Sequence, residues 1–125
     1  MKTKDKGDLA AAQAIAHFVS SGYEVSLPIG DRKPYDMIIE LDNALFKVQV
    51  KYAGFYSGSK RFKAALRTMG GNRSFSTVKK YTATDFDLLF VYTENGRKFL
   101  FPWKDIENRN SISVEASKFA NYEVK

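Results

Sequence analysis

Three polar residues on two neighbouring predicted strands have the types and spacing that a site for a hard metal ion requires. Asp36 lies at the start of one strand, and Gln49 and Lys51 lie two positions apart in the next. Because side chains alternate along a strand, Gln49 and Lys51 point to one face, whereas apolar residues such as Val50 occupy the other. We therefore expect a carboxylate, an amide oxygen and an ammonium group to meet at one end of a hairpin.

This set of groups suits the hydrolysis of phosphodiester bonds. Mg²⁺ and other hard divalent cations take oxygen ligands and neutralise the charge that develops on the phosphate. Asp36 and Gln49 offer two side-chain oxygens, and the backbone carbonyl of Val50 offers a third. Lys51 would orient or activate the attacking water, or stabilise the charge as it forms. The simpler alternative is a turn residue followed by an exposed polar strand face, and for a short motif alone that alternative is the more common one.

Composition restricts the class of protein. The 125 residues suit one domain, 1–125, and no apolar run reaches the roughly 20 residues that a membrane span needs. The absence of cysteine excludes disulfides, thiolate metal sites and cysteine nucleophiles, which fits a reducing compartment. The basic N-terminus leads into an alanine-rich amphipathic pattern, unlike a signal peptide. We expect a cytoplasmic protein with no membrane partner.

One segment carries the excess positive charge. Twenty Lys and Arg residues against 14 Asp and Glu give a net charge of +6, and residues 52–84 contain seven cations, several aromatic residues and no acid. Such a run is costly unless an anion offsets it, so it indicates phosphate binding more than a merely solvated surface. We interpret it as a basic DNA-binding insertion, in which Arg67 or Arg73 could read guanine edges. Its cations are Lys60, Arg61, Lys63, Arg67, Arg73, Lys79 and Lys80.

The hydrophobic pattern predicts the elements that must position these residues. A first helix is expected from an N-cap at Asp5 to a stop at Gly22. Its predicted apolar stripe consists of Leu9, Ala12, Ile15, Ala16 and Val19. Strands are predicted at 23–27, 35–41, 45–52, 86–92 and 97–103. A further strand near Ile112 and a short helix follow, and the basic segment is left open as a hairpin or a short helix. The order predicts an α/β fold, a mixed central sheet with flanking helices.

The motif Pro34-Tyr35-Asp36 followed by Gln49-Val50-Lys51 resembles the PD-(D/E)xK motif, with a tyrosine inserted and glutamine where an acid is usual. The whole chain resembles the homing endonucleases of this superfamily that bacterial group I introns encode. The stretches that carry this resemblance are residues 6–10 (KGDLA), 35–36, 47–51 (KVQVK) and 87–91 (DLLFV).

That resemblance implies a restriction-endonuclease-like core that hydrolyses double-stranded DNA at a specific site with Mg²⁺ or another divalent cation. It also implies that the chain assembles as a homo-oligomer, namely a tetramer. Since one active site cuts one strand, a double-strand break by itself already requires at least a dimer. The target sequence does not follow from the motif.

Position 11 departs from the resemblance. The family carries a glutamate on its first helix, directed at the metal, and the matching residue here is Ala11. From spacing alone, Ala11 belongs with Ile15 and Phe18 on a stripe that packs on the sheet. Against the family, the site keeps Asp36 as its anionic ligand and has lost the second. The hypothesis is a folded, DNA-binding variant that is impaired in metal binding and cleavage.

Two alternatives remain open. A Holliday-junction resolvase shares the motif and would prefer four-way junctions to linear duplex. A non-catalytic nucleic-acid binding module would bind DNA without metal-dependent cleavage, even after Ala11→Glu. Other titratable residues are more simply structural: His17 on the helix has no evident partner, and Asp85 and Asp87 open a strand.

Overall fold

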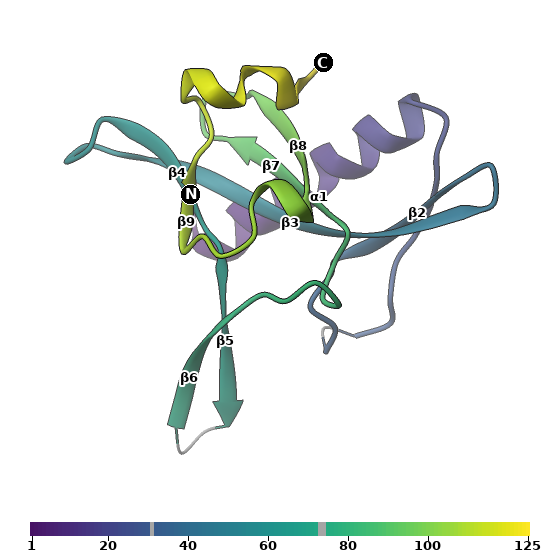
Figure 1. Cartoon of the computed structure of the whole chain (residues 1–125), viewed down its shortest axis with the longest axis horizontal. Helices are drawn as coiled ribbons and strands as arrows, with labels where there is room; N and C mark the ends of the chain where they lie inside the picture. The colour runs from purple at the N-terminus through teal and green to yellow at the C-terminus, as the bar shows by residue number, and fades with distance from the viewer. Residues whose placement is uncertain (31, 73–74) are drawn as a thin grey trace.

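One helix and the C-terminal segments cover the two faces of a mixed β-sheet in this computed structural model, which describes residues 1–30, 32–72 and 75–125 (Figure 1). The helix is α1, Thr3–Ser20, and two short 3-10 helices are η1, Trp103–Asp105, and η2, Ser117–Tyr122. The strands are β1 Glu24–Ser26, β2 Met37–Leu41, β3 Ala44–Tyr56, β4 Arg61–Ala65, β5 Arg67–Asn72, β6 Phe75–Lys80, β7 Leu88–Thr93, β8 Lys98–Pro102, β9 Ser111–Ser113 and β10 Glu123–Val124. No helix in the described ranges is both long and apolar enough to cross a membrane.

The sheet runs in the order β1-β2-β3-β7-β8-β10, with β3 and β7 parallel and the other neighbours on this path antiparallel. The end of β3 continues past β7 to pair with β4, which in turn pairs with β9. The predicted α/β class with a mixed central sheet is confirmed. In the described part of the chain its flanking helices are α1 and the two 3-10 helices.

The basic segment folds as strands. After β4, strands β5 and β6 form a separate antiparallel hairpin that projects from the body of the domain (Figure 1). Of the two forms that the sequence left open, the structure therefore has the hairpin. Both strands of this hairpin come from within residues 52–84, whereas the earlier part of that segment, the end of β3 and β4, belongs to the main sheet.

The β2–β3 hairpin fixes the register on which the candidate site depends. Its turn residues Asp42 and Asn43 have φ values of 52° and 71°, the left-handed conformations of a tight hairpin turn. Pairing runs from Leu41↔Ala44 back to Met37↔Val48. The register thus leaves β3 without a β2 partner beyond Val48, immediately beside the residue that precedes β2.

Two apolar clusters lie on opposite faces of the sheet. Val48, Val50 and Phe90 pack with α1 on one face. Leu89 and Val91 pack on the other, with the C-terminal segments. β7 is therefore buried on both faces, as its apolar sequence predicted. Because the second face is also covered, the Gln49 side of β3 faces protein over much of its area.

The phase of the helix differs from the prediction. The buried residues of α1 are Ala10, Ala14 and Phe18, not the predicted stripe, and the N-cap is Lys2 while Asp5 lies inside the first turn. Alanines occur on several sides of this helix, so the sequence contains little contrast from which to read its orientation. Small residues at 10 and 14 allow α1 to approach the sheet, and this close packing sets the phase.

Candidate active site

Asp36 lies just before β2 and is held against β3 by two hydrogen bonds. Its backbone N–H donates to the carbonyl of Val48 at 2.8 Å, and its carboxylate Oδ2 accepts the N–H of Val50 at 2.8 Å. Where β2 stops pairing, the Asp36 side chain takes over as partner of the free edge of β3. The residue as a whole is exposed, whereas its carboxyl group lies against β3 and is partly buried, with one oxygen fixed by the Val50 N–H.

The Gln49 side chain is a buried amide whose NH₂ group and oxygen both have hydrogen-bond partners. Only 8% of the residue is exposed, and its Nε2 donates to the carbonyl of Pro34 at 3.2 Å and to the hydroxyl of Tyr81 at 3.0 Å. Its Oε1 lies 2.9 Å from the N–H of Val50, the same group that bonds Asp36. The amide oxygen and the carboxylate therefore lie side by side. An exposed polar strand face, the simpler alternative from the sequence, does not describe Gln49.

The carbonyl of Val50 points to the same side. The N–H and C=O of one strand residue face the same neighbour, and those of the next residue face the opposite one. Val48 and Val50 both turn these groups toward Asp36, because the Val48 carbonyl and the Val50 N–H both bond to it. In the described register β2 pairs only as far as Val48, so β2 offers the Val50 carbonyl no partner. This oxygen is therefore a candidate ligand for a cation.

Lys51 brings positive charge to the group. Its Nζ lies 5.3 Å from the centre of the Tyr81 ring. Burial of the Asp36 carboxyl raises its pKa, while the Val50 N–H and the charge of Lys51 lower it in turn. The structure thus places Asp36, Gln49 and Lys51 together at one end of the β2–β3 hairpin. Their chemical roles stay a prediction.

Ala11 is half-buried and lies at a cavity that also reaches Asp36. It lines a cavity of about 280 Å³ together with Ile15, Lys33 and Asp36. The stripe expected from Ala11, Ile15 and Phe18 is found in part, because Phe18 is buried and Ile15 packs against the α1 cluster, whereas Ala11 is half-buried at the flank of α1. A longer side chain at position 11 would enter this cavity beside Asp36.

The candidate metal ligands are of the type that a hard cation binds, but together they carry little negative charge. Asp36, Gln49 and Val50 all present oxygen, the ligand type of Mg²⁺. Within the described ranges, no group of three or more histidine, aspartate or glutamate side chains is placed to hold a metal. These residues therefore fit a divalent ion through two neutral oxygens and one carboxylate.

The predicted DNA-binding cations lie in several separate places on the domain. Lys63 lines a groove of about 510 Å³ together with Lys51 and Lys6, which lies near the start of α1. Lys6 was not among the predicted residues, because it stands far from the basic segment in sequence. Nothing in its spacing could have placed it beside Lys51. We call this cavity the lysine groove.

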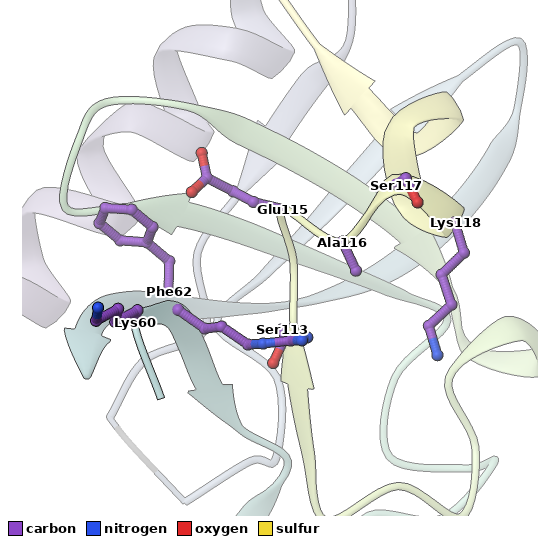
Figure 2. A pocket seen from close by; sticks show the side chains of 8 residues that line it. Lys60, Phe62, Ser113, Glu115, Ala116, Ser117 and Lys118 are labelled. Atoms are coloured by element: carbon purple, nitrogen blue, oxygen red, sulfur yellow. The ribbon is translucent and has the colours of Figure 1, made fainter. Parts of the chain in front are cut away.

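The other cations lie elsewhere. Lys60 and Arg61 line a separate cavity with Glu115 and Lys118, which Figure 2 shows between β4, the segment after β9, and η2. None of the three candidate catalytic residues lines it.

The last members of the predicted set belong to the β5–β6 hairpin. Arg67 Nε donates to Asn110 Oδ1 at 3.2 Å, and Lys80 is exposed at the end of β6. Arg73 and the side chain of Lys79 lie outside what the structure describes.

Tyr81 is a second residue that the sequence did not single out. It counted only as one of several aromatic residues among the cations, yet it contacts both Gln49 and Lys51. Its pairing with Gln49 spans 32 positions, and no local pattern encodes such a contact.

Two sets of titratable residues behave as structural groups. His17 packs against Phe18 and Phe90, with ring centres 5.2 and 5.7 Å apart, and burial lowers its pKa. Asp87 Oδ2 accepts the backbone N–H of Lys47 at 2.8 Å, which joins the start of β7 to β3. Asp85 Oδ2 accepts the N–H of Thr82 at 2.7 Å within a turn. These contacts agree with the turn and strand-edge roles expected for the acidic pair.

Comparisons with known proteins found a matching family model and a similar solved structure. A family model described as PD-(D/E)XK endonuclease matches residues 1–121. The solved structure of a bacterial homing endonuclease, I-Ssp6803I, superposes with a TM-score of 0.84 at 30% sequence identity, over 98% of this chain and 89% of that chain. No curated protein matches the sequence.

Proposed function

From the premise that this chain belongs to the PD-(D/E)XK endonuclease family, we propose that it hydrolyses phosphodiester bonds of double-stranded DNA at a specific site, as a homing endonuclease weakened at position 11. The observation that carries the proposal is the Val50 N–H. It lies within hydrogen-bonding distance of oxygens from both Asp36 and Gln49, beside the charge of Lys51. A carboxylate, an amide oxygen and an ammonium group thus converge on one edge of β3.

Each residue would have a distinct part in the reaction. Asp36, the Gln49 amide oxygen and the Val50 carbonyl would hold Mg²⁺ or another divalent cation, which when bound neutralises the negative charge that develops on the phosphate. Lys51 would orient the attacking water or stabilise the developing charge. The hydrogen bonds on Asp36 and Gln49 fix both side chains beforehand, so little reorganisation is needed during the reaction.

The site offers little negative charge for binding a divalent cation. The family glutamate on the first helix corresponds to Ala11, which leaves space beside Asp36 and no second carboxylate. A non-catalytic DNA-binding module is accordingly the second candidate function. The observation that favours it is that no group of three acidic or histidine ligands occurs in the described residues. The gain of cleavage on restoring the acid distinguishes the two.

The assembly and origin of the protein stay predictions. A double-strand break requires two active sites, so we propose at least a dimer, and the family resemblance favours a tetramer. An origin in a bacterial group I intron and a cytoplasmic location rest on the sequence alone.

The lysine groove is proposed as the path of the DNA strand next to the site. If all seven predicted cations contact phosphate, the binding constant should fall with salt at a log-log slope near about −6. Lys6→Met and Lys63→Met should each make the slope shallower by about 1. Titrations of duplex DNA at several salt concentrations measure this slope.

The control for the groove is Lys104→Met, which removes an exposed lysine from η1. It should leave the slope unchanged. Unchanged slopes in both groove variants would exclude the groove from the interface, and a slope near zero for the parent chain would exclude the basic segment as a whole.

The function itself is tested by incubating the protein with a plasmid library, with and without Mg²⁺, and sequencing the ends. We expect ends that recur at one sequence only when Mg²⁺ is present, with a low yield for the native chain and a high yield for Ala11→Glu. Ends scattered at random, or no ends from either protein, would contradict a site-specific endonuclease. A four-way junction in the same assay tests the resolvase alternative.

A further inference from the structure

Tyr81 is a buried residue at the base of the projecting hairpin. It follows Lys80, the last residue of β6, and is 6% exposed. Its ring packs edge-on against Phe86 at 5.1 Å between ring centres and belongs to the apolar cluster opposite α1. The ring is therefore held by the core, while its hydroxyl extends to β3.

This one side chain contacts two of the three candidate catalytic residues. The hydroxyl accepts a hydrogen bond from Gln49 Nε2 at 3.0 Å. The face of the ring receives the Lys51 ammonium, with Nζ 5.3 Å from its centre. Both residues lie on the same side of β3, so Tyr81 lies across both of them.

Two one-way contacts decide which end of the Gln49 amide faces Asp36, because the Pro34 carbonyl can only accept a hydrogen bond and the Val50 N–H can only donate one. The Tyr81 hydroxyl can do either, and in this orientation it accepts the second N–H of the amide. An amide carries one oxygen and one NH₂ group, and rotation by half a turn exchanges them. Here the two N–H groups have acceptors in the Pro34 carbonyl and the Tyr81 hydroxyl, so the oxygen is directed to the side of Asp36. Removal of the hydroxyl would leave a donor unsatisfied in a residue that is only 8% exposed, and that is costly.

A carboxylate at position 49 would have no N–H that needs the Tyr81 hydroxyl as an acceptor. Both ends of a carboxylate are oxygen, so either orientation offers a ligand to a cation. The amide offers a ligand in one orientation and a repelling NH₂ group in the other. The requirement for Tyr81 is thus specific to glutamine at this position.

We propose that Tyr81 is a positioning residue that accepts the second N–H of the Gln49 amide, and so holds the amide in place with its oxygen toward Asp36, while its ring holds Lys51 beside it. This inference rests on the proposed nuclease function for its catalytic consequence. Its structural part, the orientation of Gln49, stands independently and is measured independently.

The first test is NMR spectroscopy of the Gln49 side-chain amide in the native chain, with the signal assigned from its loss in Gln49→Glu. Tyr81→Phe keeps the ring on Phe86 and Lys51 and removes only the hydroxyl. We expect both side-chain amide proton signals of Gln49 to shift and their exchange with water to accelerate. The matched control is Tyr122→Phe, which removes a hydroxyl bonded to Asp105 at 2.8 Å and should leave these signals in place. Unchanged Gln49 signals in Tyr81→Phe would overturn the proposal.

The second test is cleavage in the Ala11→Glu background. Tyr81→Phe should lower kcat by about 10-fold or more with little change in KM for DNA, as expected for a group that orients a metal ligand. In the Gln49→Glu background the same change should lose most of its effect. An equal loss in both backgrounds would mean a general structural role and overturn the proposal. If Ala11→Glu does not cleave at all, the proposed function fails, whereas the NMR result still decides the role of Tyr81.

Discussion

Replacing Ala11 by glutamate is expected to increase Mg²⁺-dependent cleavage of DNA by at least about 10²-fold. Position 11 lines the same cavity as Asp36, so a glutamate there would enter the space beside the carboxylate. A second anion would offset the cost of taking a divalent cation from water, which two neutral oxygens and one carboxylate do poorly. The rate of conversion of supercoiled plasmid carrying the target site measures the gain.

Two control variants distinguish the effects of the charge and the position of the new side chain from the effect of its size. Ala11→Gln has nearly the same length as Ala11→Glu and no charge, and should gain little. Ala12→Glu adds the same charge one position along, on an exposed part of α1, and should also gain little. Equal cleavage by the native chain and by Ala11→Glu would show that position 11 does not limit the reaction. Binding without cleavage by either would favour the non-catalytic module.

Replacing Asp36 by asparagine in the Ala11→Glu background is expected to reduce cleavage by about 10²- to 10³-fold without loss of stability. Asparagine still offers an oxygen to the Val50 N–H, so the backbone contact at 2.8 Å is retained while the anionic ligand is lost. Cleavage rates and thermal melting of the same preparations measure both effects. Asp87→Asn is the matched control: it changes an acid that bonds Lys47 outside the site, so cleavage should stay near that of the parent.

The pH dependence of the melting temperature gives this prediction a second part. Burial raises the pKa of Asp36 above its unfolded value. Protonation of the Asp36 carboxyl therefore favours the folded state. This contribution to the stability of the protein is complete below the unfolded pKa of about 4 and is lost as the pH rises through the folded pKa. Asparagine has no such loss. In the metal-free native chain, Asp36→Asn should therefore melt at a slightly higher temperature at neutral pH and at the parent's temperature in acid. A lower melting temperature at neutral pH would contradict the raised pKa, and retained cleavage would contradict the role as ligand.

Local sequence was enough to predict the hairpin and the motif on it. The turn at Asp42 and Asn43 and the two-residue period of β3 follow from short-range sterics, and together they put Gln49 and Lys51 on one face. The same motif led to the PD-(D/E)XK family, which the family model and the similar structure confirm. The buried strand β7 and the mixed sheet were also predicted, because long apolar and alternating patterns depend little on distant contacts.

Tertiary packing decided the features that give the site its character. The hydrophobic pattern of an alanine-rich helix is similar on several of its sides, so the sequence does not fix which side packs on the sheet. The close packing of Ala10 and Ala14 on the sheet decided this, and it places Ala11 at the cavity that Asp36 also lines. The burial of Gln49 beneath Tyr81 joins residues 32 positions apart, and the lysine groove joins Lys6 to Lys63. The sequence determined which groups are available and the spacing of neighbours along a strand. Which distant groups meet was decided by the packing of helix and C-terminal segments on opposite faces of the sheet, because that burial is a property of the whole chain and not of any segment.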